Sequence, residues 1–251
     1  MPSFHHGDVE IAYLDEGEGE PIVLVHGFAS SKNVNWNYPG WMSELTKAGR
    51  RAIALDNRGH GESSKLYDSA QYGLETMAGD VFALMDHLSI PRADVMGYSL
   101  GSRITAVMAL KDPARLRSAI LGGIGIGGMI EGTGPGEIVA EALEAASLDD
   151  VTDPVGRTFR AFAEQTRSDR RALAACLRGS RRLMTREEAS RIGVAVLVAA
   201  GTKDEIAGSA KGLADLVAGA KVLDIPNRDH MRAVGDKVYK TGVLDFLSRR
   251  A

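Results

Sequence analysis

The pentapeptide Gly-Tyr-Ser-Leu-Gly at 97–101 carries the strongest chemical signal in this chain. It matches the pattern G-x-S-x-G, follows the apolar run ADVM and opens the helical stretch SRITAVMAL. A serine at such a strand-to-helix turn has its hydroxyl raised out of the sheet, where it can attack a carbonyl. Because short motifs also arise by chance, it is this context that favours a nucleophilic role for Ser99.

A serine hydroxyl is a poor nucleophile at neutral pH and needs a base, usually an oriented histidine. Five of the six histidines precede Ser99 in the chain, and His230 alone follows it. In the strand-turn-helix arrangement of this motif the order is serine, acid, histidine. We therefore expect His230, in the loop after the apolar run KVLDI, to be the base.

The acid should lie between these two residues. Asp204 follows the apolar run AVLVAAG at 195–201, so its carboxylate is expected at the same sheet edge as Ser99 and His230. Its role would be to hold the imidazole tautomer and to stabilise the imidazolium. Glu205 is the neighbour that could be mistaken for it, and the spacing Gly201-x-x-Asp204 favours the aspartate.

An attacked carbonyl becomes an oxyanion and needs donors that are already in place. We expect one donor to be the backbone N–H of Leu100, at the start of the helix. The second should be the N–H of Phe28, in the loop after IVLVHG, where Gly27 permits a close turn. His26 is interpreted as a residue that braces this loop rather than as a base.

Short apolar runs and helical stretches alternate along the chain, which predicts a mainly parallel, doubly wound α/β sheet. The first sixteen residues resemble an antiparallel edge hairpin. The runs lack alternation of apolar and polar residues, as expected of strands buried on both faces. They lie at 22–27, 52–56, 93–98, 118–123, 195–201 and 221–225, and the helical stretches at 41–48, 74–88, 101–111, 207–218 and 234–248.

Residues 123–192 interrupt this alternation and read as several helices. We predict a core domain of residues 1–122 and 193–251 with residues 123–192 inserted as a helical cap. The cap begins in a glycine-dense run and carries ten arginines from Arg157 to Arg191. Solvated helix faces explain this charge most simply. The alternative is that an arginine faces the pocket and favours an anionic substrate.

Five segments in order resemble an α/β-hydrolase-fold serine hydrolase of the esterase and lipase type. They are HGF at 26–28, DNRGHGES at 56–63, GYSLGS at 97–102, GTKDE at 201–205 and RDHM at 229–232. The resemblance covers essentially the whole chain. It implies an eight-stranded sheet with a helical cap, a Ser99-Asp204-His230 triad and an oxyanion hole from Phe28 and Leu100.

Departures from the family pattern reduce the number of reactions expected of this chain. Relatives that open epoxides or remove halide have an aspartate in place of Ser99, and residues 123–192 contain no tyrosine to activate an epoxide. Esters, lactones, thioesters and some carbon-carbon bonds of diketones remain as candidate substrates, with peracid formation as a candidate side reaction. The segment RDHM replaces the glycine-histidine pair common in the family.

Composition excludes several classes of protein. The 251 residues carry a formal charge of -3, so no surface for nucleic acid is implied. A single cysteine excludes an intramolecular disulfide framework. The N-terminal residues lack the layout of a signal peptide and no apolar run approaches the length of a membrane helix, so we expect a cytoplasmic protein without membrane contact.

Other candidate sites are weaker. GIGIGG at 123–128 matches G-x-G-x-x-G but lacks the acidic residue expected after a second strand, so we interpret it as a hinge. Asp56, His60 and Glu62 brace a loop more plausibly than they bind a metal, and no metal or cofactor is expected. Trp36 and Trp41 are candidate pocket residues, with packing under the cap as the alternative.

The leading hypothesis is a cofactor-independent hydrolase of small-molecule esters or related acyl compounds. Alternatives are a carbon-carbon bond hydrolase with the same triad and a ligand-sensing protein with negligible turnover. The sequence leaves the oligomeric state, the acyl chain and the leaving group open.

Overall fold

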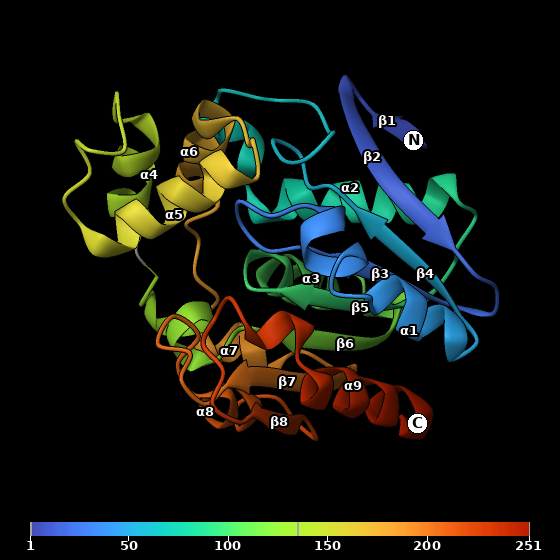
Figure 1. Cartoon of the computed structure of the whole chain (residues 1–251). Coiled ribbons are helices and arrows are strands. Elements are labelled where there is room, and N and C mark those ends of the chain that lie inside the picture. The colour runs from blue at the N-terminus through green and yellow to red at the C-terminus, as the bar shows by residue number, and fades with distance from the viewer. Residues whose placement is uncertain (1, 135, 251) are drawn as a thin grey trace.

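The structure, a computed structural model, describes residues 2–134 and 136–250. These residues form a sheet of eight strands in the order β1-β2-β4-β3-β5-β6-β7-β8 (Figure 1). The strands are β1 (Ser3–His6), β2 (Val9–Glu16), β3 (Glu20–Val25), β4 (Arg50–Leu55), β5 (Ala93–Tyr98), β6 (Leu116–Gly122), β7 (Ala195–Gly201) and β8 (Lys221–Ile225).

Strands β3 to β8 pair in parallel, and β1 and β2 form the antiparallel hairpin at one edge. The predicted α/β sheet is therefore confirmed, including the edge hairpin. The main helices are α1 (Trp41–Lys47), α2 (Leu74–His87), α3 (Leu100–Lys111), α8 (Ala210–Ala214) and α9 (Lys237–Arg249). Short helical turns are η1 (Asn33–Asn37), η2 (Ser69–Tyr72), η3 (Pro113–Arg115) and η5 (Ala233–Gly235).

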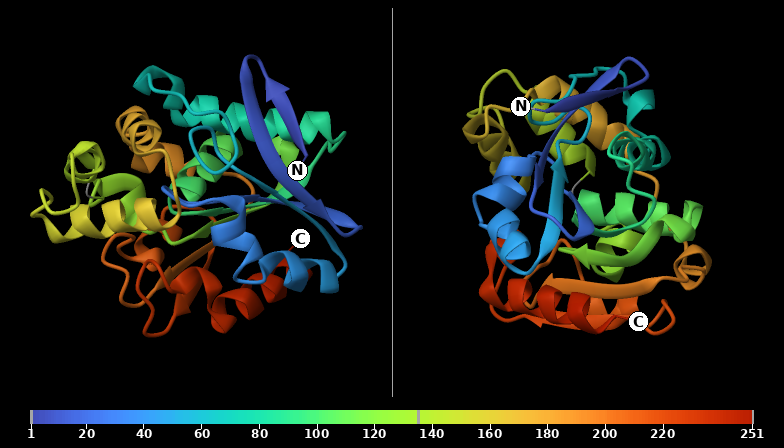
Figure 2. Two further views of the ribbon diagram at one scale, coloured as in Figure 1. Left: turned by 45° about the horizontal axis from the view of Figure 1, so that its top comes forward. Right: turned by 90° about the vertical axis from the view of Figure 1, so that its right-hand side faces the viewer.

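Successive strand residues point into two different cores. Val23 and Val25 of β3 pack with α2, α3 and α8, whereas Ile22 and Leu24 pack with α1 and α9. Figure 2 shows these two helical layers on opposite faces of the sheet. Because both faces are covered, both sets of side chains are apolar, which explains the unbroken apolar runs in the sequence.

In the described residues between β6 and β7, every regular element is a helix or a helical turn. These elements are η4 (Gly127–Glu131), α4 (Gly136–Glu144), α5 (Pro154–Gln165), α6 (Arg170–Gly179) and α7 (Arg186–Ser190). The side chains of Asp153 and Asp169 cap the N-termini of α5 and α6 by accepting backbone N–H bonds. Helices α4, α5 and α6 form a lobe, and its small apolar cluster also includes Ala29 from the loop after β3 (Figure 1).

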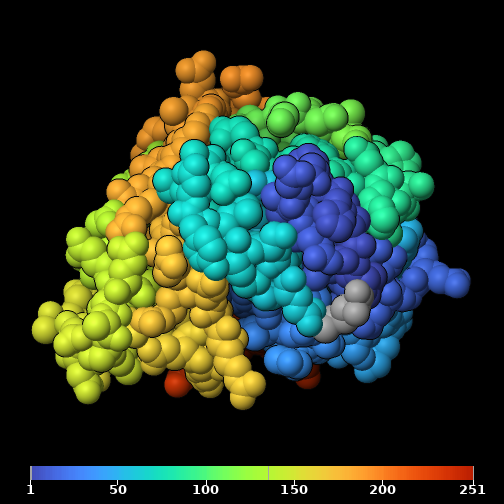
Figure 3. Space-filling model, turned by 90° about the horizontal axis from the view of Figure 1, so that it is seen from above, coloured from blue at the N-terminus to red at the C-terminus, as the bar shows by residue number. Residues whose placement is uncertain are grey.

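The α4–α6 lobe lies against the segment around η2, which the space-filling view shows beside it (Figure 3). Tyr67 donates a hydrogen bond of 2.9 Å to Asp169, and the Arg171 guanidinium lies 4.9 Å from the centre of the Tyr67 ring. By contrast, Met184 and Ala189 pack into the core beside the sheet. The inserted segment thus contains the α4–α6 lobe and, after it, a stretch around Met184 and Ala189 that packs into the main core.

Within the described ranges, the longest helices are too short or too polar to cross a membrane.

Candidate active site

Ser99 lies at the turn between β5 and α3 in a strained backbone conformation. Its φ is 52° and its ψ is -111°, which a non-glycine residue rarely adopts. The Ser99 N–H donates a hydrogen bond of 2.8 Å to the Gly122 carbonyl. A Cβ at Gly97 would collide with the Gly101 backbone, and one at Gly101 with the Val25 carbonyl. Both glycines of the motif are therefore required for this turn.

The three side chains expected to act together do meet. His230 Nε2 lies 3.0 Å from Ser99 Oγ, and His230 Nδ1 lies 2.8 Å from Asp204 Oδ2. The carboxylate accepts from Nδ1–H, so Nε2 is free to accept the Ser99 proton. A serine linked in this way to a histidine and a carboxylate can serve as a nucleophile with a built-in base.

Asp204 and His230 are held by the backbone around them. Asp204 Oδ1 accepts from the N–H groups of Ile206 at 3.1 Å and Ala207 at 2.9 Å. The Tyr98 hydroxyl donates a hydrogen bond of 2.6 Å to the His230 carbonyl. The exposed fractions of Asp204 and His230 are 6% and 9%, so the acid and the base face the site rather than bulk solvent.

Phe28 and Leu100 line the same cavity as Ser99. Leu100 is the first residue of α3, so its N–H has no intrahelical acceptor. The turn before Phe28 is fixed because the Gly27 N–H donates 3.0 Å to Asn35 Oδ1. A Cβ at Gly27 would lie 3.2 Å from the Tyr98 carbonyl oxygen, so this loop passes close to the Ser99 turn.

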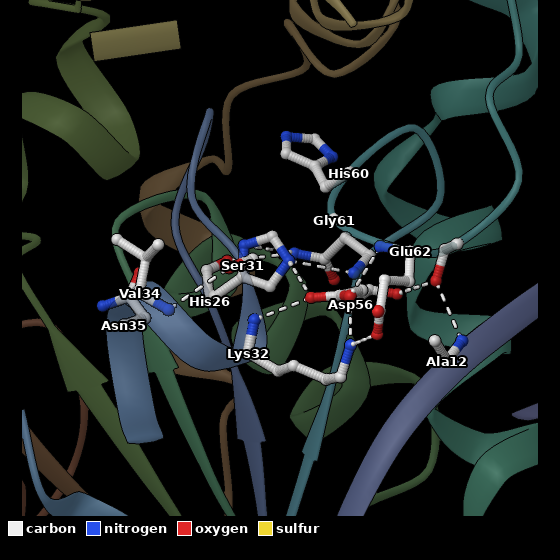
Figure 4. A network of polar contacts seen from close by, with 12 residues as sticks. Ala12, His26, Ser31, Lys32, Val34, Asn35, Asp56, His60, Gly61 and Glu62 are labelled. Atoms are coloured by element: carbon white, nitrogen blue, oxygen red, sulfur yellow. Dashed lines mark hydrogen bonds and ion pairs between the residues drawn. The ribbon is translucent and has the colours of Figure 1, made fainter. Parts of the chain in front are cut away.

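A buried ion pair joins the loop after β3 to the loop after β4 (Figure 4). Lys32 Nζ lies 2.6 Å from Asp56 Oδ2 and 2.6 Å from Glu62 Oε2. Asp56 also accepts from the N–H groups of Lys32 at 2.7 Å and Glu62 at 2.8 Å. Burial alone would raise the Asp56 pKa, but the nearby His26 and these hydrogen bonds hold it below its ordinary value.

Two buried histidines support the same loop as neutral side chains. His26 Nδ1 donates a hydrogen bond of 2.7 Å to the Gly27 carbonyl, and its Nε2 accepts one of 3.0 Å from the Asn57 N–H. His60 Nδ1 donates 2.9 Å to the Arg58 carbonyl. Burial lowers the pKa of His26. Burial and the proximity of His26 lower the pKa of His60 to about 3. His26 is thus used within the loop and is not hydrogen-bonded to Ser99.

A cavity of about 440 Å³ opens at Ser99 and His230. Its walls are mainly apolar, with Phe28 and Val34 from the core and Val139, Phe159, Phe162 and Leu177 from the α4–α6 lobe. The expectation that Trp36 and Trp41 line the pocket is corrected: both are fully buried and neither lines the cavity. Their rings pack against each other, and Trp41 packs on Tyr239 of α9 and donates 2.7 Å to the Val234 carbonyl.

Two residues near the site carry charges that the sequence reasoning did not single out. Lys32 gave no signal, because lysine is rarely fully buried. Arg103 lines the cavity and lies four residues after Ser99. That spacing on a helix is readable from the sequence and could have identified it.

Residues 20–192 match a protein family described as alpha/beta hydrolase fold. The chain belongs to this family. Over 117 residues it is 39% identical to the dihydrolipoyllysine-residue acetyltransferase component of an acetoin cleaving system from Pseudomonas putida, covering 45% of this chain and 30% of that protein. Over 121 residues it is 32% identical to a 2-hydroxy-6-oxo-2,4-heptadienoate hydrolase from Pseudomonas putida, covering 48% of this chain and 43% of that protein.

The matched segments span less than half of these curated relatives. Solved structures match over the whole hydrolase-fold chain at lower identity. An enol-lactonase from Burkholderia xenovorans LB400 superposes with a TM-score of 0.82 at 23% identity, covering 99% of this chain and 100% of that one. An esterase from Exiguobacterium antarcticum gives 0.78 at 19% identity, covering 96% of both chains. These structural similarities show the fold.

Proposed function

We propose that this hydrolase-fold protein cleaves carboxylic esters or related acyl compounds through an acyl-enzyme on Ser99. The observation that carries the proposal is the continuous hydrogen-bond chain of 3.0 Å and 2.8 Å from Ser99 through His230 to Asp204, which opens into an apolar cavity. A buried carboxylate, an oriented imidazole and a serine at a strained turn are together what nucleophilic acyl transfer requires.

In the proposed reaction, Ser99 Oγ attacks the substrate carbonyl carbon while His230 Nε2 takes the hydroxyl proton. The tetrahedral intermediate collapses as His230 returns that proton to the leaving alcohol, and an ester to Ser99 remains. Water then gives a proton to His230 and attacks this ester, and the carboxylic acid leaves as Ser99 regains its proton. Asp204 stabilises the imidazolium in both halves.

The N–H groups of Phe28 and Leu100 are the proposed donors to the oxyanion. The support is their position beside Ser99, with Leu100 at the N-terminus of α3 and Phe28 in the loop that Gly27 brings close to Tyr98. Loss of one such donor typically costs on the order of 100- to 1000-fold in rate.

We assign the role of a cap to residues 123–192. Four apolar side chains from helices α4, α5 and α6 line the cavity that contains Ser99, namely Val139, Phe159, Phe162 and Leu177. A substrate bound at Ser99 would contact them, so this segment would select the acyl or alcohol group.

The test is hydrolysis of 4-nitrophenyl butyrate by the native protein and by Ser99→Ala. We expect kcat to fall by roughly 10⁶-fold, to the limit of detection, because among the described residues the Ser99 hydroxyl alone is hydrogen-bonded to the His230 imidazole. Circular dichroism of the variant controls for folding. Comparable turnover by a folded Ser99→Ala protein would refute the proposal.

A second candidate is hydrolysis of a carbon-carbon bond in a diketone by the same residues. The relative from Pseudomonas putida named 2-hydroxy-6-oxo-2,4-heptadienoate hydrolase favours it, at 32% identity over 121 residues. A panel of vinylogous diketones and esters separates the two. Faster cleavage of a diketone than of any ester would make this candidate the leading one.

A further inference from the structure

Arg103 projects from α3 toward the same cavity as Ser99. The two residues lie one helical turn apart, and helical side chains tilt toward the helix N-terminus, which here is the Ser99 turn. Arg103 lines the cavity together with Leu177, Ser180 and Leu183 of the cap segment. A cation is therefore placed in the wall next to the nucleophile.

No carboxylate of the described ranges pairs with Arg103. Of the five N–H donors of a guanidinium, one Nη2 donor contacts the Arg182 carbonyl, and the buried Nε has no partner among the described residues. The titratable neighbour that acts on Arg103 is Cys176. Burial raises the pKa of that thiol to about 12, so Cys176 is neutral.

The other charged side chains of the cavity wall neutralise each other. Glu137 forms ion pairs with Arg181 and, at 2.9 Å, with Arg178. Arg178 is also bound by Glu144 at 2.6 Å. Arg103 alone contributes an uncompensated positive charge to the wall of the described cavity.

A desolvated charge without a partner is costly, and it becomes favourable when a ligand brings the opposite charge. Burial lowers the pKa of Arg103, which reflects this cost, yet an arginine remains protonated in proteins. The Nη1 donors and the second Nη2 donor match the planar oxygens of a carboxylate. The rest of the wall is apolar, so the ligand that fits has an anionic end and a hydrocarbon body.

We propose that Arg103 binds a carboxylate of the substrate, so that the preferred substrates are half-esters or lactones that carry a second, free carboxylate. The assignment of a substrate rests on the proposed hydrolase function. The binding of a carboxylate at Arg103 does not require turnover.

The kinetic test uses two esters that differ in one charge, mono-4-nitrophenyl adipate and its terminal primary amide. The native protein should have a kcat/KM at least tenfold higher for the acid than for the amide. Arg103→Met should remove this preference while it still hydrolyses the ester bond of the amide analogue. Arg103→Lys, which keeps the positive charge, should retain part of the preference. Equal acid-to-amide ratios for the native protein and Arg103→Met would overturn the proposal.

Calorimetry with adipate separates this inference from the proposed function. Adipate should bind Ser99→Ala. Its Kd should be at least tenfold higher for Ser99→Ala/Arg103→Met, and should rise by less for Ser99→Ala/Arg103→Lys. If native protein cleaves no ester but adipate binding depends on Arg103, the proposed function fails and the carboxylate site stands. If esters are cleaved but adipate does not bind through Arg103, the carboxylate site fails and the hydrolase stands.

Discussion

At the scale of single residues, the strain at Ser99 is made possible by the two glycines on either side. Holding a serine at φ 52° costs about 1–3 kcal/mol, which the surrounding structure must offset. It does so because α3 passes very close to β3, where Gly101 meets the carbonyls of Val25 and His26. The nucleophile is therefore positioned by the absence of side chains as much as by hydrogen bonds.

Gly101→Ala should lower the free energy of unfolding by roughly 1–3 kcal/mol or more, because the new methyl group has no space. Urea unfolding measures this loss. Gly193→Ala is the matched control: no atom lies within 4 Å of its added Cβ, so its unfolding free energy should change by less than about 1 kcal/mol. Equal stability of the two variants would contradict the close approach at Gly101.

Asp204→Asn should lower kcat by roughly 10³- to 10⁴-fold for a good ester substrate. An amide at this position donates to His230 Nδ1 and so favours the imidazole tautomer that cannot accept the Ser99 proton. Glu205→Gln is the control, since Glu205 is exposed and is the adjacent acid. Steady-state kinetics on both variants decide the assignment, and a larger loss in Glu205→Gln would reverse it.

At the scale of elements, the loops after β3 and β4 are tied together beneath the site by Lys32 and Asp56. The exposed fractions of these two side chains are 0% and 1%. Removing one partner of a buried pair leaves an uncompensated charge, which is far costlier than loss of a surface pair. The loop that contains Phe28 is thus held by a salt bridge whose residues lie outside the cavity wall.

Lys32→Met should lower the free energy of unfolding by roughly 3–5 kcal/mol. Adding Asp56→Asn should cost less in this variant than in the native protein, because the charge left behind is then removed. Lys211→Met is the control, because the Lys211–Asp215 pair is 72% and 60% exposed and should contribute less than about 1 kcal/mol. Chemical unfolding that gives Lys32→Met and Lys211→Met the same loss would contradict the role of the buried pair.

At the scale of the whole molecule, buried neutral histidines make folding sensitive to acid. An unfolded histidine takes up a proton near pH 6.5, whereas folded His60 does so only near pH 3. Between these values the unfolded chain binds more protons, so the free energy of unfolding falls as the pH falls. The lowered pKa of Asp56 acts in the same direction at still lower pH.

His60→Phe should therefore reduce the slope of stability against pH between about 6.5 and 3. Each histidine that protonates only on unfolding contributes up to about 1.4 kcal/mol per pH unit in this window. Thermal unfolding from pH 7 to pH 4 measures the slope, with His5→Phe, at an exposed histidine, as the control. An unchanged slope in His60→Phe would mean that His60 protonates in the folded protein.

Local sequence predicted the central strands well because they are apolar on both faces, as Ile22 and Val23 of β3 illustrate. The meeting of Ser99 with His230 followed from motif order and from strand ends that share one edge of the sheet. Trp36 and Trp41 could not be placed in this way. Their burial depends on Tyr239 of α9, about two hundred residues away in the chain, with ring centres of Trp41 and Tyr239 5.1 Å apart. Contacts of this range leave no local pattern.

Ser99 as the nucleophile is tested most directly by reaction of the native protein with a fluorophosphonate, followed by mass spectrometry of its peptides. We expect one phosphonyl group per chain, attached to Ser99, with labelling greatly slowed in His230→Ala. We expect no labelling in Ser99→Ala. Modification at another residue, or none in a folded native protein, would contradict Ser99 as an activated nucleophile.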